Sequence, residues 1–173
     1  VGAEKVAIGI EENKPEAIKA LTEASQKVPN CRVEALPGRY PQGAERSIIK
    51  ALTGMWLPAG KLPMSLGVLV QNVGSCAAIA NAVVRGIPLI ERVITVTGPA
   101  VREPKNVLAP IGTSWSDLLA FCGGTTDDIG RLVMGGPMMG IAQNSMSLPL
   151  VKGSSGLLAL RKPGTTMLAK RMA

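Results

Sequence analysis

The sequence predicts an α/β protein in which a partial Rossmann-like layered sheet is followed by a small β-grasp domain. Three observations favour this fold class. Short apolar runs alternate with helical patterns up to about residue 87. After Pro88 the pattern changes to short strands around a single helix. Twenty glycines and thirteen prolines in 173 residues supply the tight turns that such an arrangement needs.

The first half begins with a predicted strand–helix–strand unit. Residues 5–10 are mostly apolar and predict a buried strand, and residues 31–36 predict a second strand. Between them, Asn13 is the expected N-cap of a helix with Pro15 in its first turn. A unit of this kind is most simply parallel and right-handed.

Two further helices follow in the first half. One is expected over residues 44–53 and stops at Gly54. A predicted strand at residues 68–70 leads into a helix over residues 75–85, which Gly86 closes. The predicted order to this point is β-α-β-α-β-α.

The second half predicts the β-grasp pattern. Residues 92–97 and 106–109 read as two strands, and a further strand is expected at residues 131–134. Between them lies one helix, over residues 115–122, with Thr113 or Ser114 as its cap.

The end of the chain predicts a strand that returns to the first half. Residues 156–160 are apolar and need a sheet to join, and the polar loop 152–155 would let the chain cross. The expected organisation is therefore a first α/β domain, a β-grasp domain, and a return strand with a basic tail, over residues 1–87, 88–150 and 151–173. Apolar surface left on the first domain would favour self-association at its sheet edge, as contacts or a dimer.

Composition limits the function classes. The net charge is +7, but the basic residues are scattered and the chain has only four aromatic residues, too few to stack nucleic-acid bases. We therefore expect no nucleic-acid partner and interpret the charge as a solvated surface. A basic face could equally assist docking on an anionic membrane or on the phosphates of a ligand.

Other chemistries are excluded by residues that are missing. No histidine is present, which rules out imidazole acid–base catalysis, serine triads and histidine metal sites within these residues. Cys31, Cys76 and Cys122 form no CxxC pair, so we expect no metal site and interpret them as buried, reduced thiols of a cytoplasmic protein. No apolar run approaches the length of a membrane span, and no signal peptide opens the chain.

One candidate site lies at the start of the helix over residues 44–53. Tyr40 and Gly43 precede this helix, and Glu45 lies in its first turn. A glycine there lets a planar ring approach the backbone, and the exposed N–H groups of a helix N-terminus favour anions. The same residues also suit an ordinary helix start in which Glu45 complements the helix dipole.

Gln71 and Asn72 form a second candidate segment, where the predicted strand ends and the next helix begins. Such strand ends form the usual ligand edge of an open α/β sheet, and amides can both donate and accept hydrogen bonds. Capping of the helix by Asn72 or Ser75 is an equal alternative. The loop over residues 134–140 lacks the lysine and hydroxyl of a P-loop, and we interpret it as structural or inter-domain.

Six motifs in order resemble a known family: Tyr-Pro-Gln-Gly-x-Glu at residue 40, Ala-Leu-Thr-Gly at 51, Gln-Asn-Val-Gly at 71, Val-Thr-Gly-Pro-Ala-Val at 96, Met-Gly-Gly-Pro-Met-Met-Gly at 134 and Lys-Gly-Ser-Ser-Gly at 152. The chain resembles the C subunit of the Rnf ion-translocating electron-transport complex, which is similar to the NADH-binding flavoprotein subunit of respiratory complex I. The resemblance implies a soluble-ligand-binding β-grasp domain in the second half.

The resemblance also implies a flavin site. Tyr40, Gly43 and Glu45 match the motif that lines the isoalloxazine and nicotinamide site, with Glu45 in the catalytic position, and Gln71 and Asn72 would hold the flavin. The cofactors implied are FMN and NADH. The partners implied are other subunits of a membrane electron-transport complex, with the parent protein peripheral on the cytoplasmic face of the bacterial inner membrane.

The ends of the chain lead us to expect a fragment. In the resembled family a glycine-rich loop precedes this region and two cysteine clusters that bind [4Fe–4S] centres follow it, so the fragment alone should be inactive. One alternative is the cobalamin reductase of propanediol-utilisation microcompartments, which resembles the same family. Another is a binding or scaffold module without catalysis.

Overall fold

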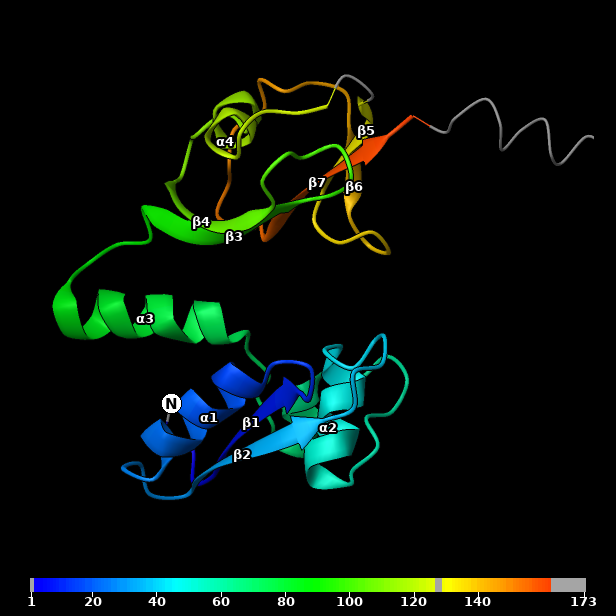
Figure 1. Ribbon diagram of the computed structural model, residues 1–173. Coiled ribbons are helices and arrows are strands. Elements are labelled where there is room, and N and C mark those ends of the chain that lie inside the picture. Colours follow the sequence, from blue (N-terminus) through cyan, green and yellow to red (C-terminus); the bar gives the residue numbers. More distant parts are fainter. Residues whose placement is uncertain (1, 127–128, 163–173) are drawn as a thin grey trace, which may run out of the picture. The chain divides into compact units, whose positions relative to one another are not determined.

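The computed structural model describes residues 2–126 and 129–162 of the chain (Figure 1). The chain divides into two compact units, unit 1 over Val1–Cys76 and unit 2 over Ala77–Ala173. Both units contain sheets and helices, which confirms the predicted mixed α/β class. The predicted domain boundaries themselves stay predictions.

Unit 1 is built on two parallel strands. Strands β1 (Val6–Glu11) and β2 (Cys31–Leu36) pair from Val6 opposite Cys31 to Glu11 opposite Leu36. Helix α1 (Pro15–Ser25) connects them, since a parallel pair needs a crossover. The predicted strand–helix–strand unit and its parallel pairing are confirmed.

The start of α1 differs from the prediction. Lys14 is the N-cap, without a side-chain capping bond, and Pro15 occupies the first turn. Asn13 does not cap the helix, and its Oδ1 instead accepts a hydrogen bond of 3.0 Å from Lys14 Nζ. Proline in the first turn needs no N–H partner there, so this helix start does not require a capping side chain.

Helix α2 (Glu45–Thr53) packs against β1, where Ile48 lies beside Gly9, and the side chain of Ile49 is buried. Gly9 of β1 leaves the space for this packing. A Cβ at Gly9 would lie 2.7 Å from Leu36 Cδ1, closer than real contacts allow, and 3.3 Å from Ile48 Cδ1 of α2, which is a tight contact. The helix ends as predicted at Gly54, which adopts a left-handed conformation at φ 74°.

The predicted strand at residues 68–70 is wrong. The chain there is extended after a short 3-10 helix, η1 (Pro63–Leu66), but pairs with no strand, because the sheet of unit 1 consists of β1 and β2 in the part that the structure describes. An apolar run becomes a strand only where a neighbouring strand accepts and donates its backbone hydrogen bonds. Helix α3 (Val73–Arg85) follows, and the boundary between the units falls within it.

Unit 2 contains a five-stranded sheet with the strand order β4-β3-β7-β5-β6. Strand β7 is parallel to β3 and antiparallel to β5, while β3–β4 and β5–β6 are antiparallel pairs. The sequence reasoning identified four of these strands and missed the short β6. The strands are β3 (Glu91–Thr97), β4 (Lys105–Pro110), β5 (Ile129–Met134), β6 (Ile141–Gln143) and β7 (Gly156–Arg161).

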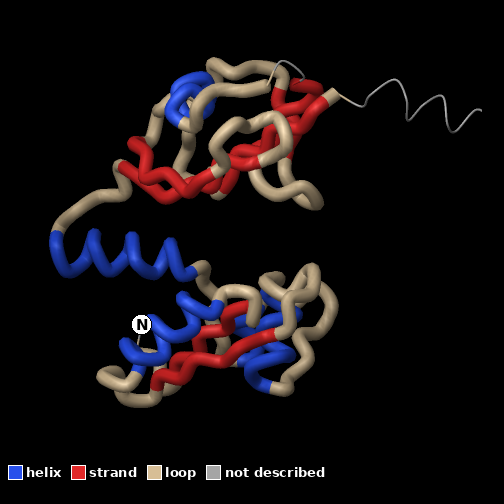
Figure 2. The backbone as a smooth tube through the Cα atoms, in the orientation of Figure 1, coloured by secondary structure: helices blue, strands red, loops and turns tan. Residues whose placement is uncertain are grey.

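A single helix, α4 (Trp115–Phe121), lies over one face of this sheet (Figure 2). Its buried side chains, Trp115, Leu118 and Leu119, form one hydrophobic cluster with inward-facing residues of the strands. Ser114 caps the helix, because its Oγ accepts a hydrogen bond of 3.1 Å from the N–H of Asp117. The cap predicted as Thr113 or Ser114 is therefore Ser114.

The destination predicted for the last strand is wrong. The apolar strand exists as β7, but it does not return to the first half: it pairs with β3 and β5 in the middle of the sheet of unit 2. Leu157 and Ala159 are fully buried there. The β3–β4 and β5–β6 pairs each present an unpaired edge to β7, so the strand finds its partners locally.

Gly98, directly after β3, sets how closely the chain passes β7. Its φ is 118°, and a Cβ there would overlap the carbonyl of Ala159, at 2.9 Å from the carbonyl carbon. The neighbouring Ala100 N–H donates to Ala159 O at 3.1 Å. A side chain at Gly98 would have to push β7 away from β3.

We expect Gly98→Ala to lower the free energy of unfolding of unit 2 by about 3 kcal/mol or more, because overlap with β7 adds to the backbone strain. Gly112→Ala is the matched control. Gly112 also has a positive φ, of 99°, but a Cβ there meets nothing within 4 Å, so only a strain cost of about 1–2 kcal/mol applies. Urea unfolding followed by the fluorescence of buried Trp115 measures both. Equal losses would contradict the close-approach argument.

Candidate functional site

Two tight backbone turns shape the segment before α2. The N–H of Gln42 donates to Arg39 O at 2.6 Å, and that of Ala44 donates to Pro41 O at 2.9 Å. Tyr40 lies in this segment with its side chain exposed. The turns therefore fix the backbone that leads into the helix and leave the aromatic ring available on the surface.

The N-terminus of α2 has open polar groups. Its N-cap, Ala44, is extended and offers no side-chain acceptor to the first-turn N–H groups. Gly43 precedes it, and a Cβ there would meet nothing within 4 Å. Glu45 is exposed in the first turn of the helix. A planar or anionic group can thus reach this backbone without displacing a side chain.

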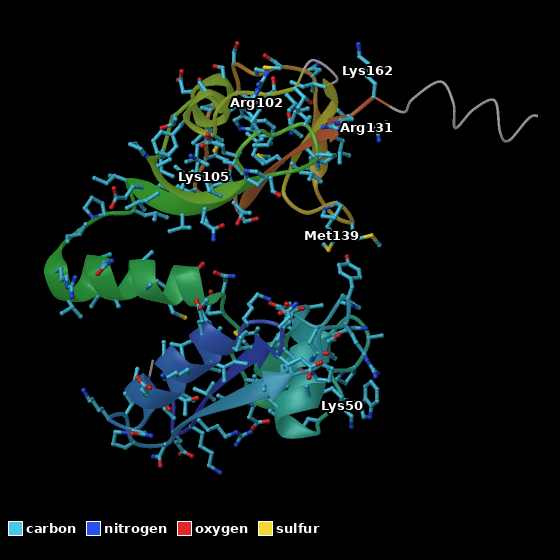
Figure 3. All side chains as sticks on the ribbon, viewed as in Figure 1. Lys50, Arg102, Lys105, Arg131, Met139 and Lys162 are labelled. Atoms are coloured by element: carbon cyan, nitrogen blue, oxygen red, sulfur yellow. The ribbon has the colours of Figure 1, made fainter. Side chains whose placement is uncertain are left out.

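A loop that the sequence reasoning treated only as proline-rich is tied to α2. Arg46 Nη2 donates to Pro58 O at 3.1 Å. Lys50 Nζ donates to Gly54 O at 2.7 Å and lies 4.6 Å from the centre of the Trp56 ring, a cation–π contact (Figure 3). A lone tryptophan six residues after a lysine gives too weak a pattern to predict this contact.

The second predicted segment lies before α3. Asn72 Oδ1 accepts a hydrogen bond of 2.9 Å from the N–H of Gly74, and Asn72 O accepts one of 3.0 Å from the N–H of Cys76. Asn72 therefore caps the helix, as the capping interpretation proposed. Gln71 is exposed, and its amide forms no hydrogen bond within the part of the chain that the structure describes.

The five predicted site residues all belong to unit 1 and all are exposed. They flank the N-termini of two helices, but across residues 2–126 and 129–162 no hydrogen bond joins the α2 group to the α3 group. The stretch 37–85 that contains them has five basic residues and a single acidic one, Glu45. This positive balance suits a phosphate-bearing ligand.

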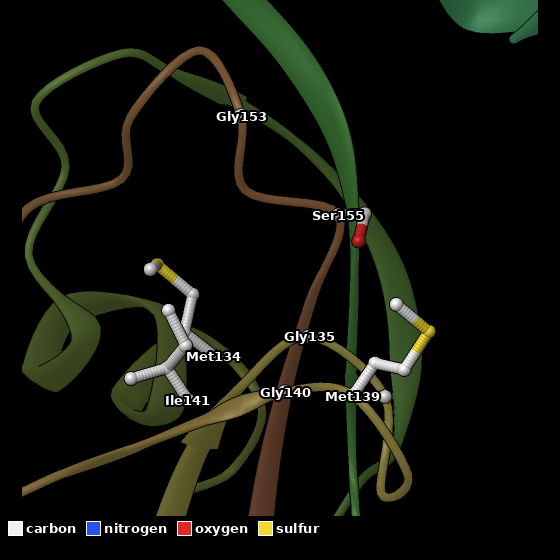
Figure 4. Close-up of a pocket in the computed structure, with 8 residues that line it drawn as sticks. Met134, Gly135, Met139, Gly140, Ile141, Gly153 and Ser155 are labelled. Carbon is white, nitrogen blue, oxygen red and sulfur yellow. The ribbon is translucent and has the colours of Figure 1, made fainter. Parts of the chain in front are cut away.

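Two hollows of the structure lie elsewhere, in unit 2. The first, of about 280 Å³, is formed where the loop over residues 134–141 meets Gly153 and Ser155 (Figure 4). The second, of about 240 Å³, shares Gly135, Gly136 and Ser155 with it. None of the five predicted site residues lines either hollow. The sequence reasoning had assigned this loop a structural or inter-domain role.

The three cysteines differ in exposure, and all are free. Cys122 is fully buried, and its burial raises the pKa of the thiol; nearby Lys105 acts to lower this pKa, and Glu103 acts to raise it. Cys31 is half-buried and Cys76 is exposed. The prediction of buried thiols is therefore right for Cys122 alone, since Cys76 faces solvent from α3, which buries no residue.

Within the described ranges, no group of three or more cysteine, aspartate or glutamate side chains could hold a metal ion. The same residues contain no helix that is both long and apolar enough to cross a membrane.

Comparisons with known proteins connect both units to one family. Residues 1–81 match the Nuo51 FMN-binding domain, and residues 93–142 match the SLBB domain. The chain is 50% identical over 162 residues to the C subunit of the proton-translocating ferredoxin:NAD(+) oxidoreductase complex of Clostridium ljungdahlii, and the match covers 94% of this chain and 35% of that protein. It is 43% identical over 162 residues to the C subunit of the Na(+)-translocating complex of Acetobacterium woodii, and this match covers 94% of the present chain and 37% of that protein. It is 51% identical over 156 residues to the C subunit of the ion-translocating oxidoreductase complex of Pseudomonas aeruginosa, and this match covers 90% of the present chain and 20% of that protein.

The chain belongs to this family of C subunits. It spans from a fifth to somewhat over a third of the length of these three relatives. The five predicted site residues fall within the part that matches the FMN-binding domain, and the loop over residues 134–141 falls within the part that matches the SLBB domain. The resemblance drawn from the six motifs is confirmed.

The thiols give a test of the core of unit 2. We expect a thiol-alkylating reagent at pH 8 to modify Cys76 rapidly in the native chain and Cys122 only after unfolding in urea, because burial both blocks access and disfavours the thiolate. The modified cysteines are identified by peptide mass spectrometry. Rapid native modification of Cys122 would contradict this burial.

The raised pKa of Cys122 also has a pH consequence. The unfolded thiol ionises near its ordinary pKa of 9.0, whereas the raised pKa of the folded thiol keeps its proton bound to a higher pH, so the unfolded state binds fewer protons and stability falls as the pH rises through about 9. We expect Cys122→Ala to show a shallower alkaline fall than the unchanged chain, in urea unfolding from pH 8 to pH 10.5. Identical slopes would contradict the shift.

Proposed function

We propose that this chain is part of a subunit that oxidises NADH through FMN and passes the electrons to iron–sulfur clusters of a membrane ion-translocating complex. The observation that carries the proposal is the match of residues 1–81 to the FMN-binding domain, in which α2 begins with uncapped N–H groups next to the open Gly43. The names of the relatives, which include ferredoxin:NAD(+) oxidoreductase and ion translocation, support it.

The proposal concerns a whole protein of which this chain covers a part. The matched region makes up 20% to 37% of the three relatives, so the [4Fe–4S] clusters are assigned to parts outside these 173 residues. The partners are other subunits of the same complex. A subunit that serves ion translocation would lie on the cytoplasmic face of the membrane, where NADH is available.

The residues before and within α2 suit the reacting end of the cofactor. Gly43 would give the flavin ring access to the backbone, because a side chain there would occupy the open space. Tyr40 would provide an exposed aromatic face beside it. Glu45 would orient the nicotinamide or repel misplaced negative charge, and it is our candidate for the catalytic position.

Gln71 and Asn72 would hold the flavin from the α3 side. Asn72 Oδ1 is engaged with the N–H of Gly74, which orients the side-chain amide so that its Nδ2 is left as a donor. The Gln71 amide can donate and accept. Bound FMN would supply the chemistry, by accepting a hydride from NADH and releasing electrons singly, while these side chains supply position and polarity.

The finer fold descriptions belong to the same proposal. The parallel β1–β2 pair with its crossover helix is consistent with part of a Rossmann-like sheet. In unit 2 the antiparallel pairs β3–β4 and β5–β6 flank the central strand β7, which is parallel to β3, and the single helix α4 lies across the sheet. This arrangement supports a β-grasp fold.

Two other functions are less well supported. A cobalamin reductase would use the same flavin residues with a corrinoid acceptor, but the relatives described above are named as subunits of oxidoreductase complexes. A binding module without catalysis would need no flavin residues, and the match to an FMN-binding domain favours catalysis.

The role of Glu45 is tested in the full-length subunit. We expect Glu45→Gln to lower NADH–ferricyanide reductase kcat/KM about tenfold or more, equivalent to about 1.4 kcal/mol of transition-state stabilisation per decade. Glu16→Gln is the matched control, because Glu16 also lies in the first turn of a helix, α1, and carries the same dipole contribution. Unchanged activity in both variants would contradict a catalytic role for Glu45 and favour a scaffold role for this part of the subunit.

We expect the 173-residue chain alone to bind FMN weakly, because the five candidate residues are exposed and line neither of the hollows described above. Titration of FMN with the chain, followed by flavin fluorescence, measures this. Tight, stoichiometric quenching would show that these residues form a complete site.

A further inference from the structure

Helix α2 carries a positive charge at the end where the helix dipole disfavours it. Arg46 is its second residue, directly after Glu45. Of the four α-helices that the structure describes, α2 is the one with an arginine or lysine among its first three residues. A helix dipole stabilises a cation at the C-terminus and disfavours one at the N-terminus. Lys50, in the last turn of α2, follows this rule and Arg46 does not.

A hydrogen bond holds the side chain of Arg46 against the loop that follows α2. Its Nη2 donates to Pro58 O at 3.1 Å, and the same oxygen accepts a hydrogen bond of 3.2 Å from the N–H of Lys61. Pro58 follows Leu57, whose side chain is buried, so this carbonyl has a defined place. The guanidinium is therefore held near the first turn of α2, although the residue as a whole is exposed.

No carboxylate neutralises this guanidinium in the part of the chain that the structure describes. The ion pairs there join other residues, namely Lys14 with Glu11, Arg32 with Glu34 and Lys105 with Glu103. Arg46 and Glu45 are neighbours in the sequence, yet they are not paired. The start of α2 therefore carries two separate charges of opposite sign.

These two charges adjoin the segment that we propose as the flavin site. Gly43, with its open backbone, lies just before α2, and residues 1–81 match an FMN-binding domain. When NADH becomes NAD(+), its hydride adds two electrons and one proton to FMN, and so one negative charge. A ring that becomes negative beside the carboxylate of Glu45 is harder to reduce unless a cation offsets that carboxylate.

We propose that Arg46 sets the reduction potential of FMN bound at the N-terminus of α2. Its charge stabilises the reduced, negatively charged flavin, offsets the carboxylate of Glu45 and adds to the field of the open N–H groups. Charge placed near the ring is one of the means by which a protein tunes a flavin. An arginine suits this role because its guanidinium stays protonated. This inference rests on the proposed function, in that FMN occupies this site.

A purely structural role for Arg46 leads to a different result. If the arginine served only to hold Pro58, its loss would loosen the loop and weaken the binding of oxidised and reduced FMN by the same factor, so the potential would not change. A charge that acts on the ring favours reduced FMN over oxidised FMN. The reduction potential therefore separates the two roles, whatever happens to the overall affinity for FMN.

The test is a spectroelectrochemical titration of FMN in the full-length subunit, with an FMN-depleted sample as the blank for other absorbing groups. We expect Arg46→Gln to lower the equilibrium constant for reduction about tenfold, a shift of about 30 mV to more negative potential for a two-electron couple. Arg46→Lys keeps the charge, so its potential should stay close to that of the unchanged subunit. Glu45→Gln should shift the potential in the opposite direction.

Lys27→Gln is the matched control, because it removes the same charge from another exposed residue of unit 1. Lys27 precedes β2, whereas the segment that leads into α2 follows it, and the six residues of β2 span about 17 Å. This separation exceeds the Debye length of about 8 Å at physiological salt, so we expect no shift.

Equal shifts in Arg46→Gln and Lys27→Gln would overturn the inference, because they would reflect net charge alone. Where a variant holds FMN too weakly for the titration, the ratio of the dissociation constants of reduced and oxidised FMN gives the same quantity. Bound FMN with an unchanged potential in Arg46→Gln overturns this inference alone. A full-length subunit that binds no FMN overturns the proposed function as well.

Discussion

The close approach of the chain at Gly98 to strand β7 is the constraint on which unit 2 depends. Only a residue without a side chain lets the segment after β3 pass so near the carbonyl of Ala159. That approach seats β7 between β3 and β5, where Leu157 and Ala159 complete the cluster under α4. Without the central strand the sheet would be two separate hairpins with one helix, and neither hairpin alone would bury enough apolar surface to be stable.

The position of the loop between β5 and β6 depends on the same arrangement. The loop at residues 134–141 is anchored to Gly156 at the start of β7, and Ser155, just before it, lines both hollows. Strand β7 therefore contributes Leu157 and Ala159 to the hydrophobic cluster, and at its start Gly156 O accepts the hydrogen bond that anchors the loop. In unit 1 Gly9 leaves space in β1 for the side chains of Leu36 and of Ile48, which belongs to α2.

Local patterns predicted most elements because the signals are local. Alternating apolar residues at 31–36 and the glycine after Thr53 specify a strand and a helix end without reference to the rest of the chain. Pairing is not local: the run at residues 68–70 has strand character but no neighbour, and the partners of β7 depend on which sheet has a gap. The candidate flavin residues were found through motifs, whereas the hollow arises from loops brought together by the sheet, which no short pattern encodes.

The position of β7 has a consequence for the order of folding. The strand in the middle of the sheet is the last of its strands to be synthesised, and it pairs with β3 across roughly sixty residues of intervening chain. During translation the β3–β4 hairpin must therefore wait with the free edge of β3 unpaired until residues 156–161 emerge. Unit 2 cannot mature progressively from its beginning, so in the cell its exposure to chaperones and proteases is set by the time needed to make this central strand.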